Sequence, residues 1–266
     1  MIFGGEQTPH LLDLAALGRT LVSPGMAGEV ELIDIRPHKR LVFLSRDDGA
    51  VTMWQQPRPE CSYIIGARWS PEWPVAFVVN QRNGDQVAMF RQPCTPAEFA
   101  ERVSELCRFY NWAFLVPEID EADFGDALLR TDYPLDRIFS RRRDPHGVGS
   151  GLPEHMGFER TPVSIAQLIQ DLDEAIRGNL RTPEGISSRI TIRSPLALQE
   201  CRTFVSGPDG KPGFADGSHG GCVWAAALAA YGLQFVTRDQ APGGVKRLKG
   251  FEPLGERKRR RPDYGG

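Results

Sequence analysis

Carboxylate side chains gather just after one strongly apolar segment of the chain. The apolar residues 112–116 are followed, after one proline, by the acidic residues Glu118, Asp120, Glu121, Asp123 and Asp126. Carboxylate oxygens are the ligands that hard divalent cations such as Mg²⁺ take in proteins. On position alone, however, a carboxylate at a strand end is most often a solvated or capping group, and an acidic cluster is most often a loop and first helical turn. A metal site at Glu118 therefore needs support from the rest of the sequence.

A second unusual place is His219-Gly220-Gly221, which opens an alanine-rich segment with a helical pattern. The first turn of a helix favours Asp or Glu through the helix dipole, and Gly is worse than Ala by up to about 1 kcal/mol in a helix interior. Two glycines are locally unfavourable there. Either the backbone needs their freedom at this turn, or side chains that were once useful have been lost.

Two basic runs are candidates for contacts with phosphate. Arg141, Arg142 and Arg143 begin a polar, glycine-rich segment that we expect to be a loop, and a second run covers residues 257–261. Such runs are usually solvated charge, although guanidinium groups also meet nucleic-acid phosphates electrostatically.

The composition describes an ordinary folded protein. The chain has 266 residues, of which 41% are hydrophobic and 25% charged, which excludes wholesale disorder, collagen-like repeats and coiled coil as classes. The formal net charge of −2 carries no global signature of a nucleic-acid partner. No apolar run reaches the length of a membrane span and no signal peptide opens the chain, so we expect a cytoplasmic protein without membrane contact. The five widely spaced cysteines are expected to be reduced thiols.

The elements that must position these residues follow a regular order from residue 61 onward. Thr95-Pro96-Ala97-Glu98 is a capping box that opens an amphipathic helix ending near Asn111, and a helical pattern covers 126–130. Because strands and helices alternate in this part, the later strands are expected to pair in parallel through right-handed crossovers. Apolar runs predict strands at 63–67, 75–79, 86–90, 112–116 and 135–139.

Three regions are expected on either side of these elements. Residues 1–60 read as a lead-in with a short helix and two edge strands, and the part before residue 50 is expected to make few core contacts. Residues 61–232 read as one compact domain with a mixed sheet, and residues 233–266 as a polar, basic tail. Within the domain, a capping box at Ser164 to Gln167 opens a helix that stops at Gly178, and a hairpin is expected between Arg202 and Ala215.

Three antiparallel strands, a helix, and then parallel strands alternating with helices is the order of a ribonuclease H-like α/β fold. Over residues 52 to 232 the sequence also resembles the nuclease domain of the large terminase subunits of tailed phages, the motors that cut and package viral DNA. Three segments carry this resemblance: Trp54…Pro57…Tyr63-Ile64-Ile65-Gly66, Tyr110-Asn111-Trp112-Ala113…Glu118…Gly125, and Phe214-Ala215-Asp216-Gly217-Ser218-His219.

The resemblance implies a two-metal phosphodiester chemistry, with carboxylates from the end of the first strand, the end of the fourth strand and the start of the last helix. This sequence departs from the family pattern at two of these three positions. The family's Gly-x-Asp becomes Gly66-Ala67-Arg68, Glu118 is present, and the family's His-Asp-Asp becomes His219-Gly220-Gly221. One acid of three is kept, which is too little charge for two metals unless another acid moves in. The candidates for that role are Glu72, Asp120, Asp123 and Asp216.

The resemblance further implies a domain involved in phage DNA packaging in the host cytoplasm, with impaired metal-dependent endonuclease chemistry. It would bind double-stranded DNA, with Arg141 to Arg143 as contacts, beside a separate packaging ATPase, a portal or a small terminase subunit. No Gly-x-x-x-x-Gly-Lys-Ser/Thr phosphate loop occurs, so we expect the nuclease half alone.

Two alternatives stay open. The first is an active endonuclease that uses Glu118 and Asp120 with Mg²⁺ or Mn²⁺ and non-standard ligands. The second is a non-catalytic protein-interaction module. In each of these readings we expect Arg68 beside Glu118, because the first and fourth strands are parallel neighbours about 4.8 Å apart.

Overall fold

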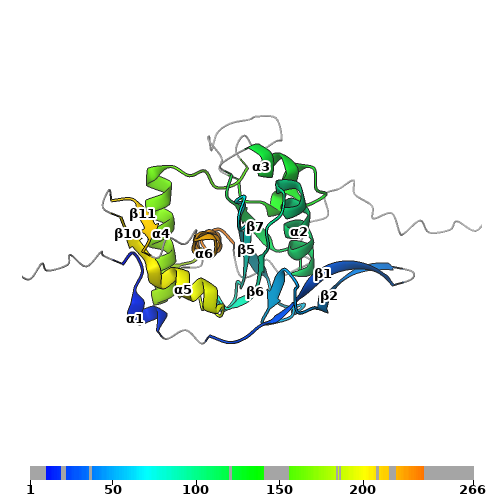
Figure 1. Cartoon of the computed structure of the whole chain (residues 1–266), viewed down its shortest axis with the longest axis horizontal. Coiled ribbons are helices and arrows are strands. Elements are labelled where there is room, and N and C mark those ends of the chain that lie inside the picture. Colours follow the sequence, from blue (N-terminus) through cyan, green and yellow to red (C-terminus); the bar gives the residue numbers. More distant parts are fainter. Residues whose placement is uncertain are drawn as a thin grey trace, which may run out of the picture.

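The computed structural model describes residues 10–18, 22–35, 38–119, 122–140, 156–183, 185, 187–207, 210–215 and 220–236. These residues form a seven-stranded mixed sheet with helices on both faces (Figure 1). Strands β4 and β7 pair in parallel, and the other neighbouring strands of the sheet pair antiparallel. The strands lie in the order β2 (His38–Ser45), β1 (Met26–Ile35), β3 (Val51–Met53), β6 (Gln86–Arg91), β5 (Val75–Asn80), β4 (Tyr63–Arg68) and β7 (Phe114–Pro117).

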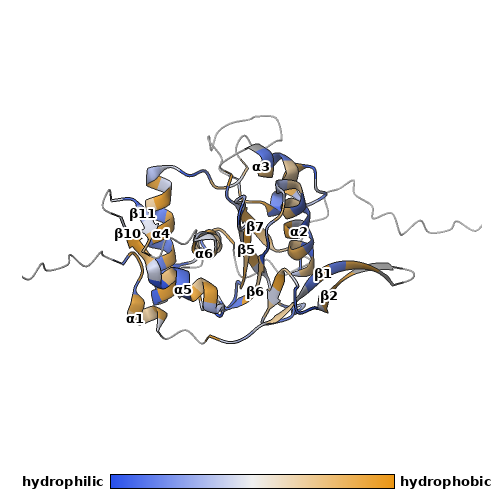
Figure 2. Cartoon of the chain, viewed as in Figure 1, coloured by the Kyte–Doolittle hydropathy of each residue, from blue (hydrophilic) through white to orange (hydrophobic). Residues whose placement is uncertain are grey.

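The centre of the sheet is built from the apolar runs. Every residue of β5 is buried, and β5 and β7 are coloured mostly as hydrophobic between the helical layers (Figure 2). The predicted hairpin between β5 and β6 is confirmed. Gly84 has a φ of 69° and donates its backbone N–H to the carbonyl of Asn80 at 2.7 Å. The turn needs a left-handed backbone at this residue, and glycine adopts this conformation without steric cost.

Two layers of helices cover the sheet, as Figure 1 shows. One face carries α2 (Pro96–Phe109) and α3 (Ala122–Leu129). The other face carries α4 (Pro162–Arg177), α5 (Pro195–Thr203) and α6 (Gly221–Gly232), with the short helix α1 (Leu14–Leu17) packed against α4 and α5. The smaller elements are the 3₁₀ turn η1 (Leu135–Arg137) and the strands β8 (Leu180–Arg181), β9 (Ser187–Ser188), β10 (Phe204–Ser206) and β11 (Pro212–Phe214).

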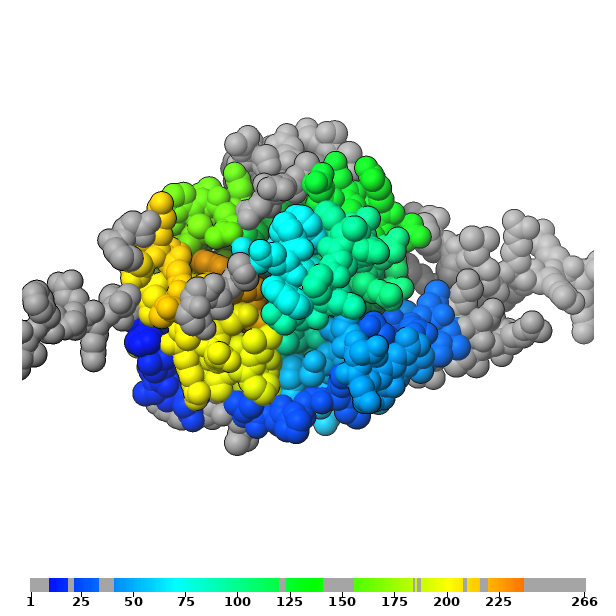
Figure 3. Space-filling model, in the orientation of Figure 1, coloured from blue at the N-terminus to red at the C-terminus, as the bar shows by residue number. Residues whose placement is uncertain are grey.

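Helix α6 is the central element of the second layer. All of its residues except Tyr231 are buried, as its apolar composition predicts. In the space-filling view only a small part of it shows between its neighbours (Figure 3). Gly66 of β4 faces the backbone of α6 so closely that a Cβ at this position would collide with the carbonyl oxygen of Ala225. The glycine therefore lets the helix lie directly on the strand, which fixes the start of α6 relative to the ends of β4 and β7.

The helix boundaries are mostly as predicted. Thr95 caps α2 in a full capping box with Glu98, and α4 ends at Gly178 in the left-handed conformation. The second capping box is displaced from the predicted one. Thr161 is the N-cap of α4 and Ser164 is its reciprocal partner, because Pro162 already occupies the first helical position. The hairpin between Arg202 and Ala215 is confirmed as the pair β10 and β11.

One expectation about the first part of the chain is wrong. The part before residue 50 does contribute to the core, since Leu12, Leu17 and Val30 are buried. The strands β1 and β3, which lie in the expected lead-in, continue the sheet, because β3 pairs with β6. The reason is that the free edge of β6 needs a partner for its backbone groups.

The predicted strand 135–139 is also wrong. It is a 3₁₀ turn followed by a single parallel bridge between Ile138 and Leu115. The 3₁₀ turn occupies residues 135–137. The two residues of the predicted strand that follow it are too few to form a strand.

The cysteines are free thiols, as expected, and all except Cys94 are buried. Among the described residues, none of the helices combines the length and the apolar character that crossing a bilayer requires.

Candidate functional site

The parallel register of β4 and β7 brings the ends of the two strands together. Gly66 lies opposite Val116, Ala67 lies opposite Pro117, and the backbone N–H of Glu118 donates to the carbonyl of Ala67 at 2.8 Å. The next residue of β4 is Arg68. The two side chains with opposite charge therefore leave the same edge of the sheet side by side.

Glu118 is buried and is paired with two arginines. Its side chain is 3% exposed, its Oε2 lies 3.5 Å from Nε of Arg68, and its Oε1 lies 3.1 Å from Nη1 of Arg160. The predicted neighbourhood of Arg68 and Glu118 is thus confirmed. Desolvation of a carboxylate is costly, and the two guanidinium groups are the opposite charges that offset this cost.

Trp224 in the first turn of α6 completes the cluster. The Cζ atoms of Arg160 and Arg68 lie 4.9 Å and 5.9 Å from the centroid of its ring, which is within the range of cation–π attraction. We call Arg68, Glu118, Arg160 and Trp224 the Glu118 cluster. Its members come from β4, from the end of β7, from the segment before α4 and from α6.

Arg160 and Trp224 are functional candidates that the sequence did not single out. Arg160 stands alone in front of a capping box, and Trp224 sits in an alanine-rich helix whose pattern indicates only burial. Neither position has a local signal, because both reach the cluster through packing of elements far apart in the chain.

The start of α6 explains the two glycines. Gly220, the N-cap of α6, is left-handed with a φ of 62°, and a Cβ there would collide with the ring of Phe214. A Cβ on Gly221 would lie 2.9 Å from Cγ2 of Val75 and 3.1 Å from the carbonyl oxygen of Trp73. The backbone therefore needs glycine at the first position and has little room at the second. An aspartate cannot be placed at these two positions without moving their neighbours.

A carboxylate does stand at the start of α6, but it comes from another helix. Glu200 of α5 accepts hydrogen bonds from the backbone N–H groups of Cys222 at 2.8 Å and Val223 at 3.2 Å. The helix dipole favours a negative charge at this place. Burial nevertheless raises the pKa of Glu200, although the hydrogen bonds from Val223 and Cys222 and the charge of Arg91 oppose this shift.

Two of the other predicted site residues lie on the surface. Glu72 lies in the exposed turn between β4 and β5, and Asp123 lies exposed in the first turn of α3. The residues Asp120, Arg141, Arg142, Arg143, Asp216 and His219 lie outside the described residues.

The described residues do not fit a two-metal centre. Within the described ranges, no group of three or more His, Cys, Asp or Glu side chains is arranged to hold a metal ion. Glu118, the acid at the position that the resemblance assigns to a ligand, shares its carboxylate with two cations. A hard metal ion needs several oxygen ligands. Positive side chains next to those ligands repel the metal ion and disfavour its binding.

Comparison with solved structures identifies the fold. The large terminase nuclease from thermophilic phage G20c with bound magnesium superposes with a TM-score of 0.57 at 15% identity, over 85% of this chain and 98% of that one. The chain has the fold of a phage large-terminase nuclease domain. A second structure of the G20c nuclease gives a TM-score of 0.53 at 17% identity, over 82% of this chain and 96% of that chain. The Thermus phage P74-26 large terminase nuclease domain gives a TM-score of 0.50 at 17% identity, over 81% of this chain and 92% of that chain.

The terminase nuclease fold is thus recognised through its three-dimensional structure. No family model matches the sequence, and no curated protein matches it. The G20c nuclease has also been solved with bound cobalt, at a TM-score of 0.57 to this chain. The expected fold class, a ribonuclease H-like mixed sheet, is confirmed.

Proposed function

We propose that this chain is a nuclease-like domain of a phage DNA-packaging machine that binds double-stranded DNA and has lost efficient metal-dependent cleavage. The observation that carries the proposal is the pairing of Glu118 with Arg68 and Arg160. The fold similarity supports the packaging context, since the similar structures are phage large-terminase nucleases.

The charge of the cluster argues against a metal at Glu118. The two guanidinium groups provide positive charge within 3.5 Å of the carboxylate, which is the contribution that a divalent ion would otherwise make. An incoming Mg²⁺ would have to displace at least one of them and would meet the charge of the other. We therefore expect weak affinity for Mg²⁺ and Mn²⁺.

The same arrangement favours a phosphate. With one carboxylate and two guanidinium groups, the Glu118 cluster has a net charge of +1. The side chains of Arg68 and Arg160 are 17% and 26% exposed, whereas Glu118 is almost fully covered, so the arginines form the accessible part of the cluster. Guanidinium groups bind phosphate oxygens through paired, charge-assisted hydrogen bonds. Arg141, Arg142 and Arg143 stay proposed as further DNA contacts.

Cleavage is tested by incubating the purified protein with supercoiled plasmid and Mg²⁺ or Mn²⁺, with EDTA as the control. We expect no nicking above the EDTA control, together with metal binding by calorimetry that is too weak to saturate at millimolar concentration. Efficient Mn²⁺-dependent nicking would instead assign an active endonuclease that uses Glu118 with non-standard ligands.

DNA binding is tested by the fluorescence anisotropy of a labelled duplex at several salt concentrations. We expect affinity to fall as salt rises, and the variants Arg68→Gln and Arg160→Gln each to reduce the slope by about one phosphate contact. Arg46→Gln is the matched control, because Arg46 is a half-exposed arginine whose partner is Glu31 in the neighbouring strand β1. Salt-independent or absent binding would favour an interaction module without a DNA role.

The proposed partners are a separate packaging ATPase, a portal or a small terminase subunit. An open reading frame for a phosphate-loop ATPase next to the gene would support this assignment.

A further inference from the structure

An exposed tryptophan lies beside the start of α6. Trp73, in the turn between β4 and β5, is 37% exposed. Its carbonyl oxygen lies 3.1 Å from the position that a Cβ on Gly221 would take, so the turn packs against the first residue of α6. Trp224 of the Glu118 cluster belongs to the same helical turn. A single exposed aromatic ring is ordinary on a protein surface, so its neighbours decide what it can do.

The pairing of β4, β5 and β6 places two arginines on either side of the start of α6. Val75 of β5 lies opposite Arg68 of β4 and opposite Arg91 of β6. Residues directly opposite each other in a sheet point to the same face. Arg68 and Arg91 therefore leave the same face of the sheet about 10 Å apart, which is twice the distance between neighbouring strands. Val75, which contacts the start of α6, lies between them.

The guanidinium group of Arg91 holds the Trp73 ring. Its Cζ lies 4.0 Å from the ring centroid, well within the range of cation–π attraction. A ring that is already held in place loses little conformational freedom when a ligand stacks on it. Burial raises the pKa of Glu200, and the charge of Arg91 opposes this shift, so Arg91 already faces a carboxylate.

The charges at the Trp73 ring and at the Glu118 cluster differ. Near Trp73 the charge of Arg91 is opposed by Glu200, and the residue before Trp73 is the exposed acid Glu72. The Glu118 cluster has a net charge of +1, and its arginines are its accessible part. A DNA phosphate is therefore favoured at the cluster, whereas the Trp73 ring offers a flat, uncharged surface that suits a base.

A base can stack on a side chain only when a face of the base is free. In a duplex both faces of an internal base are covered by the neighbouring base pairs, whereas the bases of a single strand are open to aromatic rings. We propose that Trp73 stacks on an unpaired base of DNA whose phosphates lie at the Glu118 cluster, so that this site binds DNA with a single-stranded end more tightly than a blunt duplex. This inference rests on the proposed function, which supplies the position of the phosphates. Because every base has such a face, we expect no preference for sequence.

The test is the fluorescence anisotropy of three labelled DNA probes that share one duplex. The first is blunt, the second carries a short single-stranded thymidine overhang, and the third carries an overhang of the same length without bases. The second and third probes have the same phosphates, so the ratio of their affinities measures the contribution of the bases. We expect the thymidine overhang to bind at least about fivefold more tightly than the abasic one, which is the effect of one stacked base.

Variants of exposed residues assign this ratio to Trp73. Trp73→Ala should bring the ratio close to one, and Trp73→Phe, which keeps an aromatic ring, should retain most of it. Trp112→Ala is the matched control, because Trp112 is 47% exposed but precedes β7, whereas Glu118 follows this strand. The ratio should stay unchanged in Trp112→Ala. The melting temperature of Trp73→Ala shows whether this variant is folded.

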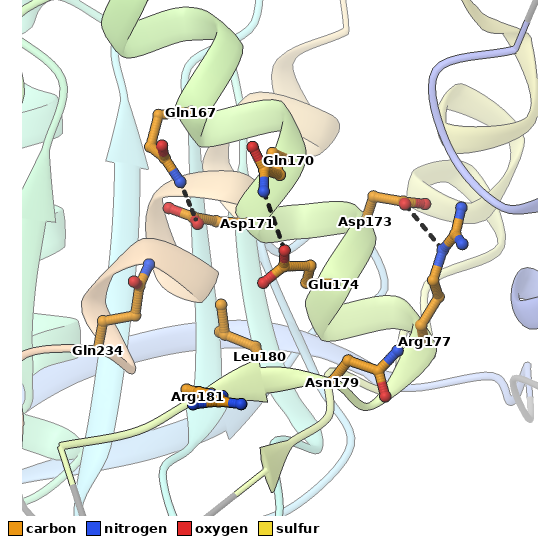
Figure 4. A pocket seen from close by; sticks show the side chains of 10 residues that line it. All are labelled: Gln167, Gln170, Asp171, Asp173, Glu174, Arg177, Asn179, Leu180, Arg181 and Gln234. Atoms are coloured by element: carbon orange, nitrogen blue, oxygen red, sulfur yellow. Dashed lines mark hydrogen bonds and ion pairs between the residues drawn. The ribbon is translucent and has the colours of Figure 1, made fainter. Parts of the chain in front are cut away.

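A second control removes an arginine elsewhere. Arg181 lines a polar cavity of about 530 Å³ at α4, β8 and the end of α6, and Figure 4 shows the side chains around it. Neither Trp73 nor a member of the Glu118 cluster is among them. Arg181→Gln should therefore leave the ratio unchanged.

The outcomes separate this inference from the proposed function. Arg68→Gln should weaken the binding of all three probes alike, because it removes a phosphate contact. If the blunt duplex binds with the expected salt dependence while the two overhangs bind equally, or if folded Trp73→Ala keeps the ratio of the unchanged protein, the stacking inference fails and the proposed function stands. If the thymidine overhang binds through Trp73 and the blunt duplex does not bind, the proposed duplex binding fails and the inference stands. Absence of binding to all three probes would overturn both.

Discussion

The Nε atom of Arg68 lies 3.5 Å from Oε2 of Glu118, across the parallel pairing of β4 and β7, and Arg160 holds the other oxygen of the same carboxylate at 3.1 Å. The two oxygens of one buried carboxylate thus each face a different guanidinium group. With two arginines, each can be lost separately at limited cost, and the loss of both exposes the full cost of a buried charge.

The first prediction comes from this arrangement. Arg68→Ala and Arg160→Ala should each lower the free energy of unfolding by about 1–2 kcal/mol, and the double variant by about 3–5 kcal/mol, because it leaves an uncompensated buried carboxylate. Glu118→Gln in the double variant should restore part of the loss. Urea denaturation measures each value. Arg46→Ala, which breaks a surface pair, should cost less than about 1 kcal/mol. Additive and equally small effects of both arginines would mean that Glu118 does not depend on them.

The second prediction concerns the start of α6. Gly220→Asp should destabilise the fold by about 2–4 kcal/mol, because a left-handed backbone costs a side chain about 1–2 kcal/mol and the ring of Phe214 fills the space for its Cβ. Restoring an acid at this position should therefore not create a metal site. Gly213→Ala is the control, since a Cβ there meets nothing within 4 Å. A stable Gly220→Asp variant with tight Mn²⁺ binding would contradict the steric argument.

The third prediction is a pH dependence that comes from Glu200. Burial raises its folded-state pKa above the ordinary value near 4.3, so the folded chain binds more protons than the unfolded chain between the two pKa values. The free energy of unfolding therefore falls as pH rises through this interval. Glu200→Gln keeps an oxygen that accepts from the N–H groups of Cys222 and Val223, but it does not titrate. The variant therefore lacks this fall in the free energy of unfolding. The stability of the variant relative to the unchanged protein should thus be lowest at pH 4 and highest at pH 7.

Denaturation at pH 3, 4, 5, 6 and 7 checks this sign, and Glu98 supplies an opposite control at the acid end of the range. Hydrogen bonds from Thr95 lower the pKa of Glu98, so its contribution is present above the ordinary Glu value and is lost as pH falls through the lowered folded pKa. Relative to Glu98→Gln, the unchanged protein should therefore gain stability as pH rises. For each glutamate, the stability of the unchanged protein relative to the Gln variant is plotted against pH. Slopes of the same sign for Glu200 and Glu98 would contradict their opposite pKa shifts.

The fourth prediction tests the part of the chain before residue 61. Leu17 of α1 is fully buried where α1 packs against α4 and α5, so Leu17→Ala should cost about 2–5 kcal/mol through lost burial and the cavity left behind. Leu14, on the same four-residue helix, is 39% exposed, and Leu14→Ala should cost much less. Chemical denaturation compares the two. Equal, small effects would mean that α1 contributes little to the core and that the compact domain does begin near residue 61.

The sequence by itself determined the features that depend on neighbours along the chain. Alternation and apolar runs defined β4, β5 and β6, the capping box at Thr95 started α2, and Gly178 ended α4, because hydrogen bonds and side-chain periodicity within a few residues decide these features. The neighbourhood of Arg68 and Glu118 was also predictable. It needs only the rule that parallel strands of one crossover lie side by side with their carboxyl ends at the same edge.

The tertiary structure alone decided the rest of the candidate site. Arg160 reaches Glu118, and Phe214 fills the space beside Gly220, only after the helical layer has packed on the sheet. The insertion of β3 between β1 and β6 likewise depends on which strand edge is left open for pairing. The energy of such contacts comes from burial and from the geometry of elements far apart in the chain. A local pattern of residue types can therefore indicate an arginine or a glycine, but not the partner that gives it a role.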